Sequence, residues 1–431
     1  MRKLFATLLF LTTAFTSAFA SDHVIVELAP GAQPSVVAAA FGGQVERSMQ
    51  GTNFYLMSVP SAAALVPNPH LGILGVELNS AVSVRPTGAI GILTTSGTKA
   101  AEWYAQQPAM KLVNAGKAAG VSSGRGMVIA DINSRVDYGH PALIGHLTSG
   151  YDFVAEQSGN GATLNQSSAS FLDQSSAGFL DQSSAGFLDQ SSAGFLDQST
   201  ASFLDQSTAS FLDQSTASFL DQSNPAHGHG TFCAGLIAAL APDAMIMPLR
   251  TFDDTGNADA FTIARAVRYA ALNGANVINM SFGMTAKSNA VDQAIKFATD
   301  RGVIVVASAG NANTNAPQFP ASANHVLGVA ATDLSDKKAS FSNYGSDVFV
   351  DAPGVNIISA YPGGYYAIAS GTSFSAPFVS AEAALLHSAS WKNSDNAISS
   401  GTVNIDAENP GYRNQLGSGR IDMFKALQSQ K

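Results

Sequence analysis

Short apolar runs that alternate with amphipathic segments are the feature that most constrains the fold of this 431-residue chain. From about Trp103 onward, some runs have the length and composition of fully buried strands, and the segments between them repeat apolar residues with a helical period. In chain order the segments are "MVIADI", "GTFCAGLIAAL", "AMIMPLR", "FTIARAVRYAALNG", "NVINMSFG", "NAVDQAIKFATDRG" and "VIVVASAGN". This order predicts an α/β fold with a mostly parallel sheet, helices on both faces, and ligands bound outside the carboxyl ends of the strands.

The segment before this region predicts a separate small α+β domain. The strand-like stretches "HVIVELAPGA", "TNFYLMSVP" and "LGVELNSAVSVRP" are separated by the short helical stretches "QPSVVAAAFGG" and "SAAALV". We interpret the region as a ferredoxin-like split βαβ sandwich over residues 21–86 with the order β-α-β-β-α-β, which has one strand more than these three stretches provide. Residues 87–102 are polar and contain Gly and Thr, so we expect a linker that is easy to cleave.

The first 20 residues predict export. Arg2 and Lys3 precede the apolar run "LFATLLFLTTAF", and Ala18 and Ala20 have the spacing of a signal-peptidase site. A buried first helix or a membrane anchor is the alternative, but the run is short for a membrane span. We expect residues 1–20 to be a cleaved signal peptide and the mature protein to be secreted without a membrane anchor.

Composition and charge exclude some function classes. Hydrophobic residues make up 46% of the chain and charged residues 12%, which is enough apolar material for a sizeable core. The net charge of −9 argues against a nucleic-acid partner, because phosphate contacts need clustered Lys and Arg. Cys233 is the only cysteine, so no internal disulfide forms, and a lone thiol is usually a small buried hydrophobe.

An octad repeat interrupts the second region at residues 165–223. "NQSSASFL" is followed by three copies of "DQSSAGFL", three of "DQSTASFL" and a final "DQS". An even period keeps each position on one face of an extended chain, whereas in an α-helix it drifts by about 80° per copy. We favour short "ASFL" strands joined by turns and stacked as a protruding insert; a disordered segment is the alternative. The repeated Asp could bind calcium, but one carboxylate per octad is few compared with the roughly six to eight oxygen ligands that calcium takes. A solvated face is the alternative.

Three motifs carry chemistry. His229 begins an apolar helix in "HGHGTFCAG", Ser373 follows Gly371 at another helix start in "GTSFSAP", and Asn311 ends a strand in "VASAGN". A serine hydroxyl becomes a nucleophile when an imidazole accepts its proton, and the oxyanion that forms needs fixed donors such as the Asn311 amide and the Ser373 N–H. Each motif alone could be a structural histidine, a helix cap or a turn. Together, in this order, they indicate acyl transfer.

These motifs resemble those of the subtilisin-like serine proteases. The matching pieces are "HGHGTFCAG", "INMSFG", "VASAGN", "FSNYGSDVFVDAPGVNIISAYPGG", "SGTSFSAPFVSA" and "GSGRIDMFKAL". The resemblance implies a three-layer α/β/α sandwich for residues 103–431 apart from the octads, with Ser373 as nucleophile, His229 as general base and Asn311 as oxyanion donor. Residues 21–86 resemble the inhibitory, chaperone-like propeptide of the same family.

The resemblance also implies where a substrate binds. Ser281, Phe282 and Gly283 match an edge strand that pairs with an extended substrate, and Gly256 and Asn257 match the loop that forms the opposite edge. Two such edges clamp a peptide by β-augmentation, so the expected substrate is an unfolded or looped protein segment. The chemistry requires no cofactor, and a structural calcium ion is compatible with the resemblance.

One position departs from the family pattern. "GRGMVIADINSRVDYGHP" aligns without a gap to the segment that carries the catalytic acid, and Asn133 occupies the place of that acid. An amide can present its donor to the imidazole as readily as its acceptor, and in a serine protease of another fold this exchange costs roughly 10⁴-fold through the wrong tautomer. Asp131 also replaces an apolar residue, and it shares a strand face with Asn133. Asp131 could act directly, through Asn133 or through a water; the alternative is a structural pairing, for example with Arg135.

Two functions follow from this departure. The first is a secreted serine endopeptidase with a weakened or rearranged acid. The second is a pseudoprotease that binds peptides or partners without turnover. An esterase with a "G-x-S-x-G" elbow is disfavoured, because residue 375 is Ser and not Gly.

Overall fold

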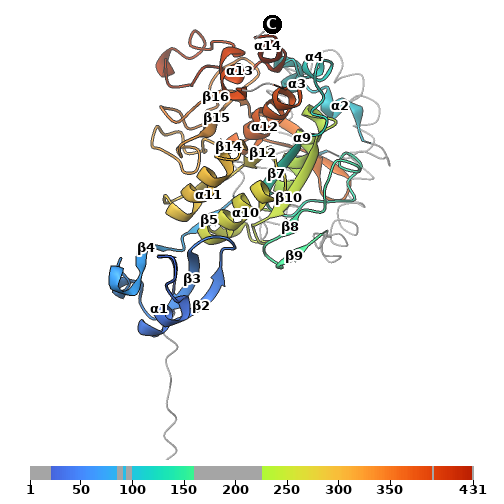
Figure 1. Cartoon of the computed structure of the whole chain (residues 1–431). Coiled ribbons are helices and arrows are strands. Elements are labelled where there is room, and N and C mark those ends of the chain that lie inside the picture. Colours follow the sequence, from blue (N-terminus) through green and yellow to red (C-terminus); the bar gives the residue numbers. More distant parts are fainter. Residues whose placement is uncertain (1–20, 85–90, 94–99, 160–225, 391–392, 430–431) are drawn as a thin grey trace, which may run out of the picture. The chain divides into compact units, whose positions relative to one another are not determined.

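The computed structural model describes residues 21–84, 91–93, 100–159, 226–390 and 393–429. They fall into two compact units that divide between Asn79 and Ser80 (Figure 1). The expected signal peptide and the octad repeat lie outside the described residues. Within the described ranges, no helix is both long and apolar enough to cross a membrane.

The first unit is a four-stranded antiparallel sheet with one α-helix. Its elements are β1 (Asp22–Leu28), α1 (Pro34–Ala40), β2 (Gln44–Ser48), β3 (Phe54–Val59), 3₁₀ turns at Ala62–Ala64 and Pro69–Leu71, and β4 (Ile73–Leu78). The strand order β2-β3-β1-β4 is that of the expected split βαβ sandwich. The helix expected in "SAAALV" is only a 3₁₀ turn, because Pro67 and Pro69 follow at once and disfavour a helical backbone before them.

The last strand expected in this region is divided between the two units. The apolar pattern predicts one strand over residues 74–86, but β4 ends at Leu78 and a separate strand, β5 (Ala81–Ser83), belongs to the second unit. The first compact unit therefore ends at Asn79, before the expected boundary at Pro86. The expected linker also contains a strand, β6 (Gly91–Leu93), which pairs with β18 (Tyr365–Ala369).

The second unit contains an eight-stranded sheet. Its strands are β7 (Val128–Asn133), β8 (Tyr151–Asp152), β9 (Gln157–Ser158), β10 (Met245–Arg250), β12 (Val277–Met280), β14 (Ile304–Ser308), β15 (Val326–Thr332) and β16 (Val350–Pro353). The order is β16-β15-β14-β12-β7-β10-β8-β9, and every pair is parallel except β8–β9. The strand β7 lies inside the sheet between β10 and β12, where the strand order reverses, and this is where such sheets bind ligands.

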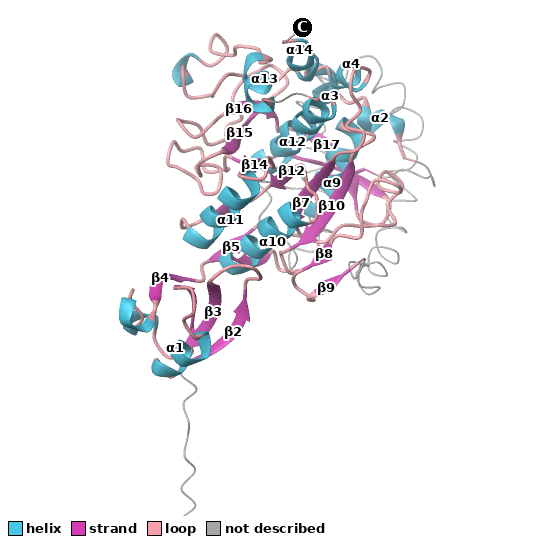
Figure 2. Ribbon diagram, viewed as in Figure 1, coloured by secondary structure: helices cyan, strands magenta, loops and turns pink. Residues whose placement is uncertain are grey.

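Helices cover both faces of this sheet. The helices α9 (His229–Leu240) and α12 (Thr372–Ser388) pack together on one face, and α10 (Ala260–Leu272) and α11 (Asn289–Thr299) pack together on the other (Figure 2). Almost every residue of α9 is buried, whereas α11 exposes the polar side chains of Asn289, Gln293 and Lys296 to solvent. The expected three-layer α/β/α sandwich on a mostly parallel sheet is confirmed.

Smaller elements complete the second unit. The remaining α-helices among the described residues are α2 (Glu102–Ala105), α3 (Pro108–Leu112), α4 (Ala115–Ala119), α13 (Ser394–Ser400) and α14 (Met423–Gln428). Two small antiparallel sheets have the orders β17-β18-β6 and β11-β5-β13, where β17 is Ile357–Tyr361, β11 is Asn257–Asp259 and β13 is Gly283–Met284.

Gly235 allows α9 to approach β17 closely, which gives a test of the packing. A Cβ atom at this position would lie 2.5 Å from Ser359 Oγ and 2.7 Å from Ala360 Cβ. We expect Gly235→Ala to lower the free energy of unfolding by about 1–3 kcal/mol, as overpacking does. Gly116→Ala in α4 is the control: it meets nothing within 4 Å, and it should leave stability unchanged or raise it by up to about 1 kcal/mol. Equal urea midpoints for the two variants would contradict this packing.

Candidate active site

The expected catalytic side chains lie where elements of the second unit begin or end. Asn133 is the last residue of β7, His229 is the first of α9, and Ser373 is the second of α12. Asn311 follows the end of β14 by three residues. Because parallel strands end at one edge of the sheet, residues far apart in sequence gather at this edge.

Asn133 and His229 are joined by a short hydrogen bond. The Nδ1 atom of His229 lies 2.7 Å from Asn133 Oδ1, and both side chains are buried. The same oxygen accepts a hydrogen bond of 2.8 Å from the backbone N–H of Ser134. Asn133 Nδ2 donates toward both oxygens of Asp131, at 3.2 Å and 3.4 Å. The amide therefore presents its oxygen to the imidazole.

Asp131 is completely buried beside Asn133. A second amide, Asn279 Nδ2 in β12, donates to Asp131 Oδ1 at 2.8 Å. The pairing with Arg135 considered from the sequence is wrong: the Arg135 guanidinium lies 3.6 Å from Asp254, because it follows the turn after β7 outward. Burial raises the pKa of Asp131 to about 7, against the opposing effect of the hydrogen bonds from Asn279 and Asn133.

Besides Asn133, two side chains contact the His229 ring. Its face packs against Phe374 of α12, with ring centroids 5.6 Å apart. Cys233, buried one turn along α9, places Sγ 3.9 Å from His229 Nδ1 and 3.6 Å from the carbonyl oxygen of Ser373. His229 Nε2 has no hydrogen-bond partner among the described residues. Burial lowers the pKa of His229 to about 4, so the imidazole is neutral at neutral pH and its Nε2 lone pair can accept a proton.

Asn311 is fixed by the residue before Ser373. Its Oδ1 accepts hydrogen bonds from Thr372 N at 2.9 Å and from Thr372 Oγ1 at 2.8 Å. The amide Nδ2 then has no acceptor within the part of the chain that the structure describes. These two hydrogen bonds hold the Asn311 side chain next to the first turn of α12.

The two expected substrate-binding edges lie on either side of a strand from this chain. β5 pairs antiparallel with β11 on one side, where Asn257 is opposite Ser83, and with β13 on the other, where Gly283 is opposite the same residue. The backbone N–H of Val84 also donates to Gly256 O at 2.9 Å. The chain's own strand β5 therefore lies between these edges as a middle strand.

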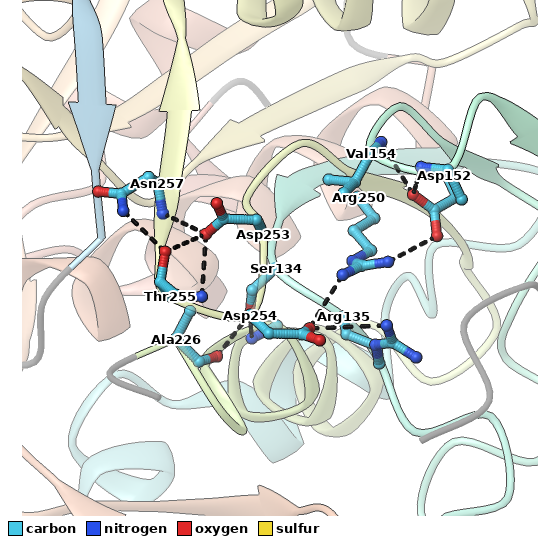
Figure 3. A network of polar contacts seen from close by, with 12 residues as sticks. Ser134, Arg135, Asp152, Val154, Ala226, Arg250, Asp253, Asp254, Thr255 and Asn257 are labelled. Carbon is cyan, nitrogen blue, oxygen red and sulfur yellow. Dashed lines mark hydrogen bonds and ion pairs between the residues drawn. The ribbon is translucent and has the colours of Figure 1, made fainter. Parts of the chain in front are cut away.

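A compact turn positions the β11 edge. Asp253 Oδ1 accepts hydrogen bonds from Thr255 N, Thr255 Oγ1 and Asn257 N, at 2.9, 2.7 and 2.9 Å (Figure 3). Beside this turn, Arg250 at the end of β10 bridges Asp152 and Asp254, each at 2.9 Å (Figure 3). Because Arg250 and Asp152 are buried, this bridge ties the turn to the sheet.

The sequence reasoning missed Asn279 and Thr372. Asn279 connects the site: besides Asp131 it donates to Ser281 Oγ at 2.9 Å, and Ser281 Oγ donates to the Ser373 carbonyl at 2.7 Å. The signal was present, because Asn279 is the polar residue of the otherwise apolar strand "VINM" and shares a face with Ser281 two positions on. Among the residues that the structure describes, no cluster of three or more His, Cys, Asp or Glu side chains is placed to hold a metal ion.

Comparison with known proteins identifies the family. The model of the subtilase family matches residues 124–419, which contain all of the catalytic side chains described above. The chain belongs to the subtilase family. Thermitase from Thermoactinomyces vulgaris is 40% identical over 212 residues, which cover 47% of this subtilase and 75% of thermitase. Subtilisin Savinase from Lederbergia lenta is 37% identical over 207 residues, which cover 42% and 77% of the two chains.

A solved structure supports the fold assignment. The crystal structure of fervidolysin from Fervidobacterium pennivorans matches 95% of this subtilase and 61% of its own chain, with a TM-score of 0.66 and 21% identity. At this identity the likeness shows the fold alone. The family and the two relatives show that this subtilase is a serine-type endopeptidase.

The turn at Asp253 gives a test of the substrate edge. Asp253→Ala removes three hydrogen bonds that hold β11 in place. The β11 edge must then become ordered when a substrate strand binds, which costs binding free energy. We expect KM to rise roughly 3- to 10-fold, about 1 kcal/mol of binding free energy, with kcat nearly unchanged. Asp333→Ala is a matched control, because Asp333 Oδ1 accepts from Ser335 N and Lys337 N in a similar turn after β15. Equal kinetics of the two variants would contradict the role of the Asp253 turn.

Proposed function

We propose that this subtilase is a secreted endopeptidase that cleaves protein segments through an acyl-enzyme on Ser373. The observation that carries the proposal is the hydrogen bond of 2.7 Å between His229 Nδ1 and Asn133 Oδ1. An amide oxygen can only accept, so the proton lies on Nδ1 and the Nε2 lone pair is left as the base.

Each step of the proposed reaction is then carried out by a residue of this site. The Ser373 hydroxyl attacks the peptide carbonyl and gives its proton to His229 Nε2. The oxyanion is stabilised by Asn311 Nδ2 and the Ser373 backbone N–H, a contribution worth about 10²–10³ in turnover for the equivalent side-chain donor of a subtilisin. His229 next protonates the leaving amine, and water then hydrolyses the acyl-enzyme by the same base.

The proposed substrate is an extended chain that lies between β11 and β13. The strand β5 supports this, because its main chain pairs on both sides while its side chains alternate between buried and exposed. Val82 and Val84 are buried, and Ala81 and Ser83 are exposed. We infer that main-chain pairing provides most of the recognition and that apolar side chains are preferred at alternate positions.

We also propose that residues 1–20 direct secretion and that the first compact unit serves as a propeptide, both inhibitor and chaperone. β5 follows that unit in sequence and occupies the place proposed for substrate, which is the arrangement of an inhibited precursor. Serine, imidazole and amides supply the proposed chemistry, so we infer no cofactor requirement; a bound calcium ion would have a structural role.

A fluorophosphonate probe tests the nucleophile. We expect covalent labelling of Ser373 in the processed protein and its loss in Ser373→Ala, because only a serine activated by an adjacent base reacts rapidly. Ser375→Ala, two residues further along α12, should keep the label. A protein that binds peptides but does not label would be a pseudoprotease, and the proposal would be wrong.

The amino terminus of the mature protein tests self-processing. If the subtilase removes its own first unit, purified active material should begin between Pro86 and Trp103, as read by amino-terminal sequencing. Ser373→Ala should then accumulate as the longer chain. The same mature terminus in both proteins would show that another protease makes the cut.

A further inference from the structure

The buried carboxylate two residues before Asn133 has no role in the reaction as written above. Asp131 is 0% exposed and lies in a strand position whose neighbours Ala130 and Ile132 are also fully buried. No Lys, Arg or His forms an ion pair with it among the residues described. A buried carboxylate without a cation is costly, and Asp131 differs from the equally buried Asp351 in that two side-chain amides donate hydrogen bonds to it.

Asp131 determines which way the Asn133 amide points. The oxygen and nitrogen of an amide have nearly the same shape, so only their partners fix the orientation. In the observed orientation, Nδ2 donates to the carboxylate and Oδ1 accepts from Ser134 N and faces His229 Nδ1. The reverse orientation would place the amide oxygen against the carboxylate and an N–H against the Ser134 N–H. The carboxylate therefore prevents the wrong imidazole tautomer that an asparagine otherwise permits.

Asp131 is itself held in place by a second amide. Asn279 Oδ1 accepts from Ser380 Oγ of α12 at 2.9 Å, which turns Asn279 Nδ2 toward Asp131. From Asn279 the hydrogen bonds continue through Ser281 Oγ to the carbonyl of Ser373. One carboxylate is thus connected to the base through Asn133 and to the nucleophile's backbone through Asn279.

We infer that Asp131 is the acidic member of this site, a positioning residue that acts on His229 through the Asn133 amide. Its hydrogen bond polarises the amide so that Oδ1 is a stronger acceptor for Nδ1–H, and its charge stabilises the imidazolium that forms when Ser373 loses its proton. This inference rests on the proposed roles of Ser373 and His229.

A double-mutant cycle separates this role from a structural one. Asp131→Asn should lower kcat on the order of 10²-fold with little change in KM, less than the roughly 10⁴-fold cost of losing a directly bonded acid. Asn133→Asp alone places two carboxylates side by side in a dry site, where they disfavour each other's ionisation. We therefore expect Asp131→Asn to raise kcat in the Asn133→Asp background and to lower it in the wild type.

This reversal of sign is the decisive result. A structural role would make Asp131→Asn harmful by the same factor in both backgrounds, and that outcome would overturn the inference, as would an unchanged kcat in the wild type. Asp351→Asn is the matched control, because Asp351 is equally buried but lies in β16 at the edge of the sheet; its kcat should not change. Thermal unfolding of every variant verifies folding, and mass spectrometry verifies that residue 133 remains an amide.

The pH dependence of kcat gives a second test of the inference. The inference requires ionised Asp131, whose pKa is raised to about 7, so kcat should be full above that pH and fall as pH drops through it. From α9, the Cys233 thiol interacts with Asp131, and the His229 imidazole is bonded to the Asn133 amide that links the two. Burial raises the pKa of the thiol and lowers that of the imidazole to about 4, so both are neutral near pH 7. From β12, Asp131 meets the neutral Asn279, and Pro248 of β10 lies opposite it in the sheet. In Asp131→Asn, kcat should no longer fall as pH drops through about 7. A fall of kcat that persists there in this variant would contradict the inference.

Nitrogen-15 NMR of the full chain carrying Ser373→Ala reports which nitrogen of the His229 imidazole is protonated, in a protein that cannot turn over substrate. We expect His229 to be protonated on Nδ1, and its Hδ1 resonance to move upfield when Asp131→Asn is added, with His229→Gln used for assignment. An Hδ1 resonance unaffected by Asp131→Asn would overturn the inference even if the enzyme is active. An inactive wild type with the expected shift would overturn the proposed reaction but support the inference.

Discussion

The convergence of parallel strand ends at one edge of a buried sheet is the constraint on which the site depends. β7, β12 and β14 enter this edge next to one another, and each contributes a polar residue at or just after its end. The helices α9 and α12 begin at the same edge, which places the base and the nucleophile in the first turns of two packed helices. This edge brings Asn133 and His229 into hydrogen-bond contact although 96 residues separate them in the sequence.

The sequence was most informative about where the site residues lie within helices and strands, and least informative about their hydrogen-bond partners. His229, Ser373 and Asn311 could be placed at helix starts and a strand end, because glycine, strand composition and apolar periodicity mark those ends. The partner of Asp131 could not be predicted, since strand alternation fixes the face of a side chain but not which neighbouring strand supplies its hydrogen bond. The division of the 74–86 strand was missed for the same reason: the apolar pattern is continuous, but the two halves pair with different sheets.

The electrostatics of the site follow from burial more than from charge pairs. The same dry surroundings shift Asp131 toward its neutral form, keep His229 neutral and raise the pKa of the Cys233 thiol. In such surroundings a single amide that is turned the wrong way would leave two unfavourable contacts, each costing about 1–3 kcal/mol. Fixed amides are therefore as important here as charges, and Asn133, Asn279 and Asn311 are each fixed by at least two hydrogen bonds.

The pairing of β5 on both of its edges has a consequence for what such an enzyme can attack. A peptide bound in this way must offer donors and acceptors from both sides of its backbone at once. In a folded protein, these groups are already engaged in helices and sheets. A target must first open locally, so its rate of digestion would follow the free energy of that opening more than its amino-acid sequence. An enzyme that binds its substrate in this way would discriminate between conformational states of its targets.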